Sequence, residues 1–149
     1  MNRTILLAVV SALFWACAAC DRHESQAVVS KNPLFVSSEW VSISLPNALA
    51  THEGWVNEIL LSVPPSYQRS VQPWGLRSPD GNFCELQAQL VTTGGALENR
   101  KMSGFWGEQP FFDERGRGQA YSEIRLRSTC AVKVSEVTFH DYDPREVKR

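Results

Sequence analysis

Apolar and polar side chains alternate along residues 121–143, and this alternation is the clearest structural signal in the chain. One parity carries apolar residues such as Ile124 and Leu126, whereas the other carries charged residues such as Arg125. A period of two residues is typical of a β-strand with one face in the core and one in water. The alternation restarts on the opposite parity after residues 135–136, so we expect a bulge or turn there.

Further stretches of the chain show strand patterns of the same kind. We expect strands over residues 34–45, 55–63, 74–77 and 83–93. Pro46 is expected to end the first of them, since proline cannot continue a central ladder, and residues 47–54 to form a loop or one helical turn. The glycine-rich, aromatic segment 96–118 predicts short strands and exposed loops. Short strands separated by Gly, Pro and Asp turns predict an all-β fold, a single β-sandwich.

Residues 1–19 have a different composition from the rest of the chain. A short apolar run, residues 5–15, follows Arg3 and precedes small residues and cysteines. This order of regions is that of a signal peptide, and the run is shorter than the roughly 20 apolar residues that a membrane-spanning helix needs. A buried N-terminal helix is the alternative, and the polar stretch that follows at once disfavours it. We therefore expect an exported protein.

The end of this segment resembles that of bacterial lipoprotein precursors, in which a cysteine behind small residues becomes the lipidated N-terminus. Cys20, which follows Cys17-Ala18-Ala19, is the matching residue. The resemblance implies a membrane anchor made of lipid, without a helix that crosses the membrane. Asp21 at the next position implies retention at the inner membrane, on the periplasmic face of the bacterial cell envelope. Ordinary cleavage after Ala18 is the alternative and would give a periplasmic or secreted protein.

The chain beyond the leader has the length of one domain. Residues 20–33 are polar and lack periodicity, so we expect a tether, followed by the sandwich over 34–143 and a charged tail over 144–149. This length allows a core without a structural metal. All 16 acidic residues and 14 of the 15 basic ones lie after position 20, which gives 14 − 16 = −2. A near-neutral balance without a basic stripe argues against nucleic acid as a partner.

Two cysteines remain within the predicted domain, Cys84 and Cys130. An even pair in an exported protein indicates a disulfide. A closed loop of about 47 residues would stabilise the fold by roughly 4 kcal/mol in the chain-entropy model. Both cysteines fall on core-facing parities, so the bond is expected to join neighbouring strands or the facing sheets. Two buried free thiols are the alternative.

Five short stretches carry a further pattern: Glu39–Leu45, Val56–Ile59, Arg77–Phe83, Tyr121–Arg127 and Val134–Phe139. In this order they resemble strands and a hairpin of the galactose-binding-like jelly roll, the sandwich of discoidin and coagulation-factor C-type domains. The likeness covers most of residues 37–143. It implies a jelly roll that binds glycans or lipid headgroups with loops at one end. The usual terminal cysteine pair is missing, and no ligand residue of that family can be assigned to a position here.

The stretch 140–143 could supply metal ligands. Asp141 and Asp143 occupy alternate positions of a predicted strand, so both carboxylates could reach one hard cation. Galactose-binding-like folds often hold a structural calcium ion, and the resemblance therefore implies this possibility. The spacing is unspecific and would need a partner from elsewhere. A solvated strand end is the alternative, and we predict no other cofactor.

Catalytic motifs are sparse. The chain has no G-x-S-x-G elbow, HExxH pair or phosphate loop,. His52 and His140 are the only histidines of the predicted domain, and they provide no specific basis for a catalytic triad. A pair of carboxylates for glycoside hydrolysis could be drawn from Glu108, Asp113 and Glu114, but composition alone does not set the distance between them. A hydrolase is therefore the third hypothesis, behind two kinds of binding protein.

Aromatic residues are numerous for this length, and six of them are Trp55, Trp74, Phe105, Trp106, Phe111 and Phe112. Flat aromatic faces beside polar groups suit sugar rings and partner proteins. Trp106, next to Phe105 and near Arg115, is the main candidate contact, and Trp74 is a further one. The alternative is that the rings fill the core. The sequence predicts a non-enzymatic binding module for a carbohydrate or envelope component; the rival hypothesis is a periplasmic protein-interaction or assembly subunit.

Overall fold

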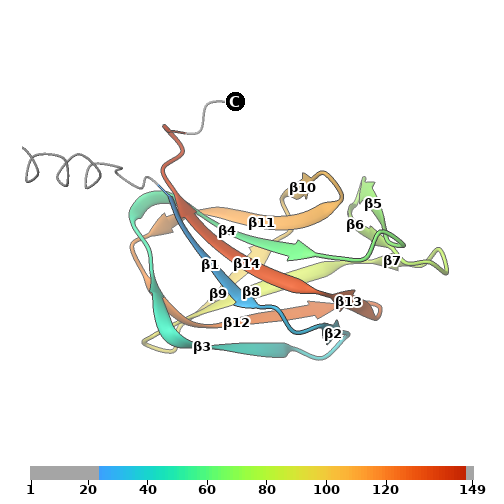
Figure 1. Ribbon diagram of the computed structural model, residues 1–149, viewed down its shortest axis with the longest axis horizontal. Coiled ribbons are helices and arrows are strands. Elements are labelled where there is room, and N and C mark those ends of the chain that lie inside the picture. Colours follow the sequence, from blue (N-terminus) through green and yellow to red (C-terminus); the bar gives the residue numbers. More distant parts are fainter. Residues whose placement is uncertain (1–23, 147–149) are drawn as a thin grey trace, which may run out of the picture.

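The computed structural model describes residues 24–146, which form fourteen β-strands and no helix (Figure 1). The strands are β1 (Glu24–Ser30), β2 (Leu34–Val36), β3 (Val41–Ala50), β4 (Glu53–Ser62), β5 (Gln68–Val71), β6 (Trp74–Arg77), β7 (Phe83–Cys84), β8 (Leu86–Thr92), β9 (Leu97–Lys101), β10 (Gly104–Trp106), β11 (Gln109–Arg117), β12 (Ala120–Ser128), β13 (Val132–Val134) and β14 (Glu136–Tyr142). Within this range no helix exists that could span a bilayer. The expected leader, the lipidation candidate Cys20, the start of the expected tether and residues 147–149 lie outside the described residues.

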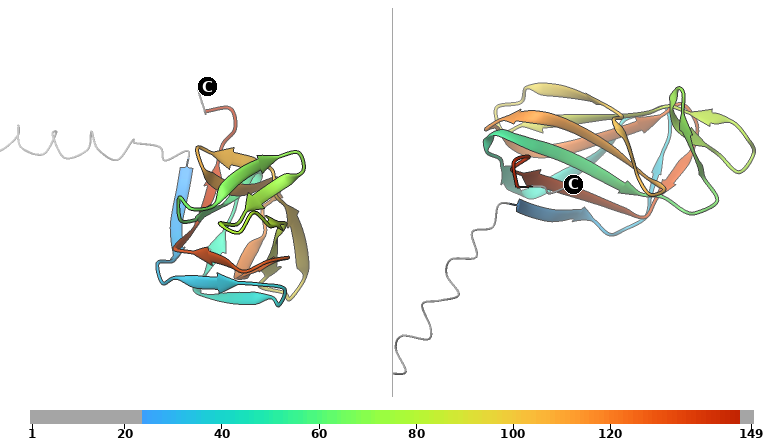
Figure 2. Two further views of the ribbon diagram at one scale, coloured as in Figure 1. Left: turned by 90° about the vertical axis from the view of Figure 1, so that its right-hand side faces the viewer. Right: turned by 90° about the horizontal axis from the view of Figure 1, so that it is seen from above.

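Two antiparallel sheets lie face to face and form the predicted sandwich (Figure 1 and Figure 2). The first has the order β1-β14-β4-β11-β10 and the second the order β3-β12-β8-β9. With β10 set aside, the remaining eight strands, renumbered in chain order, follow 1-8-3-6 in one sheet and 2-7-4-5 in the other. This is the strand order of a jelly roll. The prediction of a single all-β, jelly-roll-like sandwich is therefore confirmed.

The predicted disulfide is also confirmed, and it lies at one end of the sandwich. Cys84 of β7 is bonded to Cys130, which lies between β12 and β13, with their Cα atoms 5.2 Å apart. The two small sheets β2–β13 and β5–β6–β7 close this end (right in Figure 1). The bond links positions 46 apart, and its restraint on the unfolded chain contributes roughly 4 kcal/mol in the chain-entropy model,.

The core is built from side chains of the predicted parities. Ile124 and Leu126 of β12 are almost fully buried, and Ile124 lies opposite Ile43 of β3 and Leu90 of β8. Ile59 of β4, also buried, contributes from the other sheet. Each such side chain stabilises the fold by about 1.5–3 kcal/mol on leaving water. The expected break near residues 135–136 is present, since β13 ends at Val134 and β14 begins at Glu136.

The expectation that Pro46 ends the first strand region is wrong. β3 continues through this proline to Ala50. It is an edge strand, and the register between β3 and β12 shifts between Ser44 and Leu49, so Pro46 lies in the irregular part. Proline is tolerated at such a position because no ladder hydrogen bond from its nitrogen is required. The expected loop over 47–54 is accordingly reduced to a short connection between β3 and β4.

The expected tether over 20–33 is corrected for part of its length. Residues 24–30 form β1, which pairs with β14 in antiparallel register, from Glu24 opposite Tyr142 to Ser30 opposite Val137. Its polar composition hid this strand, because pairing at the edge of a sheet depends on backbone groups rather than on an apolar face. The expected short strands in 96–118 are present as β9 and β10, whereas β11 is longer.

Candidate functional site

The hairpin formed by β10 and β11 brings two aromatic rings onto the outer face of the five-stranded sheet. Trp106 pairs with Gln109 across a tight turn that begins at Gly107, whose φ of 62° is readily adopted only by glycine,. Gly104 lies opposite Phe111, so Trp106 and Phe111 share one face of the ladder,. Their ring centroids are 5.4 Å apart.

Trp106 is exposed and nevertheless held in one orientation. Its side chain donates a hydrogen bond from Nε1 to Oε2 of Glu58 at 2.8 Å. Glu58 lies on β4 and is only 5% exposed, whereas Trp106 is 55% exposed. A hydrogen bond to a charged acceptor away from water is stronger than one between neutral groups. The indole therefore has a fixed edge and an accessible face.

The β5–β6 hairpin adds a third ring from another part of the chain. Trp74 of β6 lies 6.0 Å from Phe105 of β10, measured between ring centroids. A Cβ atom on Gly104 would lie 3.1 Å from the ring of Phe111 and 3.9 Å from that of Trp74, so both rings approach the same point. We call Trp74, Phe105, Trp106 and Phe111 the aromatic surface.

Three of the four predicted ligand-binding residues thus come together, and one does not. Trp74, Phe105 and Trp106 belong to the aromatic surface, whereas Arg115 lies six positions beyond Gln109 along β11. Six residues of strand span about 20 Å, so Arg115 is not a neighbour of Trp106. The alternative that the rings fill the core applies to Phe112, which is completely buried, and in part to Phe105, which is half-buried and packs against the core.

Two residues of this region were not among the predicted ligand contacts. In the sequence, Phe111 is only one of several aromatic residues, and its pairing across the hairpin explains its place beside Trp106. Glu58 has a weak signal in the sequence, because it is an acidic residue whose same-face neighbours in the strand, Val56 and Leu60, are apolar. Its parity indicates that it points away from the core, but no local pattern indicates that Trp106 covers it.

The suggested metal ligands near the end of β14 have other partners. Asp141 is completely buried, and its carboxylate lies 2.7 Å from Nδ1 of His52 and 2.8 Å from Nδ2 of Asn57. Asp143 forms an ion pair with Arg145 at 2.6 Å. Among residues 24–146, no group of three His, Cys, Asp or Glu side chains is placed to hold a metal ion. The structure therefore gives Asp141 a role in a hydrogen-bonded cluster with His52 and Asn57.

The carboxylates drawn for glycoside hydrolysis do not form a facing pair. Asp113 and Glu114 are consecutive in β11 and therefore point to opposite faces of the sheet,. Glu114 is ion-paired with Arg100 at 3.1 Å. Glu108 lies in the turn between β10 and β11.

Comparisons with known proteins provide no family assignment for this arrangement. The chain matches no protein-family model, and no curated protein is detectably similar to it in sequence.

Proposed function

We propose that the protein is a non-enzymatic binding module that recognises a carbohydrate or another envelope component through the aromatic surface. One observation carries this proposal: the half-exposed indole of Trp106 is held by the nearly buried carboxylate of Glu58. A large ring that is already fixed loses little conformational freedom when a ligand covers it. The apolar face of a sugar ring packs well on such an indole, and the sugar hydroxyl groups remain free to reach polar side chains at its border.

The alternative function is a protein-interaction or assembly subunit. It is supported by an exposed apolar residue that lies beside the aromatic surface. Val71, which is 53% exposed, lies opposite Trp74 in the β5–β6 hairpin. Exposed apolar residues around aromatic rings are common where proteins associate. A glycan array and a pull-down from envelope extract, both with the purified protein, separate the two functions, and binding to neither would contradict both.

The central test is the Trp106→Ala variant. If the ring is the main contact, ligand affinity should fall by about 2 kcal/mol, or roughly 30-fold, by isothermal titration calorimetry. Trp40→Ala is the matched control, because Trp40 is remote from the aromatic surface and contacts Arg127 of the four-stranded sheet. The guanidinium carbon of Arg127 lies 4.5 Å from the centroid of the Trp40 ring. An affinity unchanged in Trp106→Ala, or equally reduced in both variants, would remove the aromatic surface from the binding site.

The proposed location is the periplasmic face of the inner membrane, with the protein anchored through a lipid on Cys20 behind a cleaved signal peptide. The support is the sequence pattern of residues 1–20,. Cys20→Ser should move the protein from the detergent phase to the aqueous phase. Mass spectrometry of the mature N-terminus provides the direct measurement, and an unmodified chain cleaved after Ala18 would contradict lipidation.

A further inference from the structure

A charged cleft lies on the open side of the sandwich, further along β11 than the aromatic surface. It is formed where β9, the edge strand of the four-stranded sheet, faces the part of β11 that β10 does not cover. Its volume is about 180 Å³, and its lining residues are Glu98, Asn99, Arg100, Glu114, Arg115 and Arg117. Every lining side chain is polar or charged, so an apolar ligand does not suit this cleft.

Arg100 forms the fixed part of the cleft. Its side chain is only 5% exposed, because its position on β9 is opposite Ala88 and shares the inward parity of that residue. Its two terminal nitrogens are held by Glu98 at 2.8 Å and Glu114 at 3.1 Å. The hydroxyl of Tyr121 donates to the same oxygen of Glu98, which orients that carboxylate. Nε of Arg100 is buried and has no hydrogen-bond partner among the described residues.

Arg115 and Arg117 supply the positive charge that remains. Both side chains are exposed, and neither forms a hydrogen bond or ion pair with another side chain of the described range. Three arginines and two glutamates line the cleft, so its formal charge is 3 − 2 = +1. Both glutamates are already engaged with Arg100, and two guanidinium groups are therefore available to a ligand.

We propose that this cleft binds the oxyanion of a small ligand, a phosphate or carboxylate group, which Arg115 and Arg117 hold beside the Nε group of Arg100. Guanidinium groups bind such oxygens with paired, charge-assisted hydrogen bonds. Pockets for whole drug-sized molecules measure about 300–1,000 Å³, so a cleft of 180 Å³ suits one anionic group or a small anion. The proposal does not depend on the aromatic surface, because Phe111, its residue on β11, lies four positions or roughly 13 Å along the strand from Arg115,.

The charged residues of this cleft could instead protect the edges of the sheets. Edge strands often carry charged residues that prevent pairing with another chain, and β9 and β11 both present such edges. In that case the arginines repel partners and bind no anion. The ordered arrangement around Arg100 favours a binding site, because repulsion alone needs no fixed guanidinium.

The test is an NMR titration of the ¹⁵N-labelled protein with sodium phosphate, sodium glucuronate and sodium chloride at constant ionic strength. Binding predicts saturable shifts of the Arg100 Nε–H signal and of the backbone amides of residues 98–100 and 114–117. Arg115→Ala with Arg117→Ala should weaken binding at least about tenfold. The double variant Arg77→Ala with Lys133→Ala removes the same charge from the disulfide end and should leave the affinity unchanged.

Competition with lipid vesicles identifies whether the anion belongs to a lipid headgroup or to a soluble ligand. Phosphatidylglycerol vesicles that compete with phosphate, when phosphatidylcholine vesicles do not, would assign the oxyanion to a lipid headgroup. Competition by neither vesicle, together with saturable phosphate or glucuronate shifts, would assign it to a soluble ligand. The proposal is overturned if neither anion gives saturable shifts, or if both double variants weaken binding equally.

Discussion

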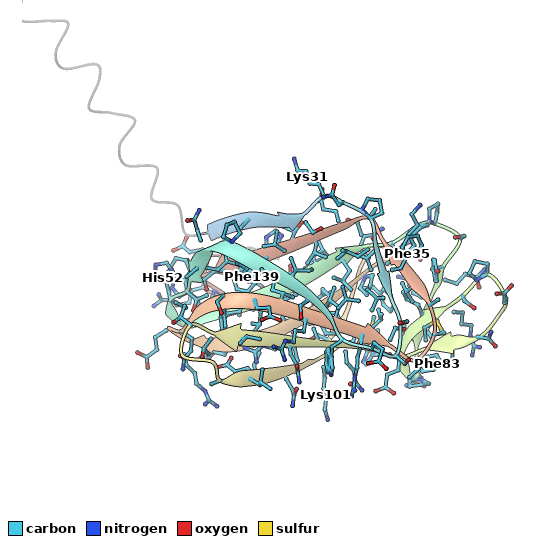
Figure 3. The ribbon with its side chains drawn as sticks, turned by 90° about the horizontal axis from the view of Figure 1, so that it is seen from below. Lys31, Phe35, His52, Phe83, Lys101 and Phe139 are labelled. Carbon is cyan, nitrogen blue, oxygen red and sulfur yellow. A yellow bond between two sulfur atoms is a disulfide. The ribbon has the colours of Figure 1, made fainter. Side chains whose placement is uncertain are left out.

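Two buried carboxylates on adjacent strands differ in the partners that they hold: Asp141 holds a backbone nitrogen and the buried Asn57, whereas Glu58 holds an exposed ring. Asp141 of β14 is directed to the interior and accepts hydrogen bonds from the backbone nitrogen of His52 at 3.0 Å and from Asn57. Glu58 of β4 lies on the outer face and accepts from Trp106. Asp141 closes the end of the sandwich that carries His52, opposite the end with Phe35 and Phe83 (Figure 3), whereas Glu58 supports a ring that remains accessible.

The comparison separates a structural cluster from a binding surface. The donors to Asp141 come from the β3–β4 connection and from β4, and they tie these segments to β14, which stabilises the fold. One donor to Glu58 is the edge of an exposed indole, and this hydrogen bond orients a surface that a ligand can cover. In this structure, a partner that belongs to the aromatic surface is what distinguishes the carboxylate beside the proposed binding surface from the one that stabilises the fold.

Asp141→Asn is expected to have the largest effect on stability. Because a carboxylate can only accept, Nδ1 of His52 carries the hydrogen of their 2.7 Å contact, and Asp141 serves three donors. An amide replaces one acceptor by a donor, so the free energy of unfolding in urea should fall by about 3 kcal/mol. Glu58→Gln keeps an oxygen for Trp106 and should cost about 1 kcal/mol. Equal losses would contradict the distinction between the two carboxylates.

Gly116→Ala should destabilise the Asp141 cluster by a smaller amount. A Cβ atom at this position would lie 2.6 Å from Oδ1 and 2.9 Å from Nδ2 of Asn57. Asn57 would have to move away from Asp141, and overpacking of this kind costs about 2 kcal/mol. Gly94→Ala is the matched control, because its nearest atom would be 3.8 Å away, at ordinary contact distance. Thermal unfolding of both variants gives the measurement, and a stable Gly116→Ala protein would show that the cluster adapts.

The sandwich and its core could be predicted from the sequence, because alternation directly reports which face of a strand is buried. Ile124 and Leu126 lie in the core as their parity indicates. Alternation does not reveal β1, whose polar residues pair through the backbone at an edge. Nor does it reveal that β3 continues through Pro46, because edge and central strands have the same local pattern but different tolerance for proline,.

The candidate site could be predicted only in part, for a related reason. Parity gives the face on which a side chain lies, but strand order decides its neighbours. Trp106 and Phe105 are adjacent in sequence, whereas Glu58 reaches Trp106 only because β4 lies next to β11. Arg115 is close to Trp106 in sequence and distant in space because β11 is extended between them.

The smallest expected effect on stability concerns Tyr121, which is completely buried and whose hydroxyl donates a hydrogen bond to the carboxylate of Glu98. Burial raises the pKa of the Tyr121 phenol above its ordinary range, and its hydrogen bond to Glu98 raises that pKa further. The unfolded chain loses the phenolic proton near its ordinary pKa of about 10, whereas the folded chain keeps it. Stability contributed by this group is therefore complete below pH 10 and decreases as the pH rises above it.

Tyr121→Phe tests this dependence and extends the comparison to a third buried oxygen. The variant should lose about 1 kcal/mol near neutral pH, because one hydrogen bond is removed. Its unfolding free energy should then decrease less steeply than that of the unmodified protein between about pH 9 and 11, since the unfolded state no longer gains from ionising this phenol. Urea unfolding across this range measures both slopes. Parallel slopes would mean that the Tyr121 proton is lost as easily in the folded chain, and that the network around Arg100 is open to water.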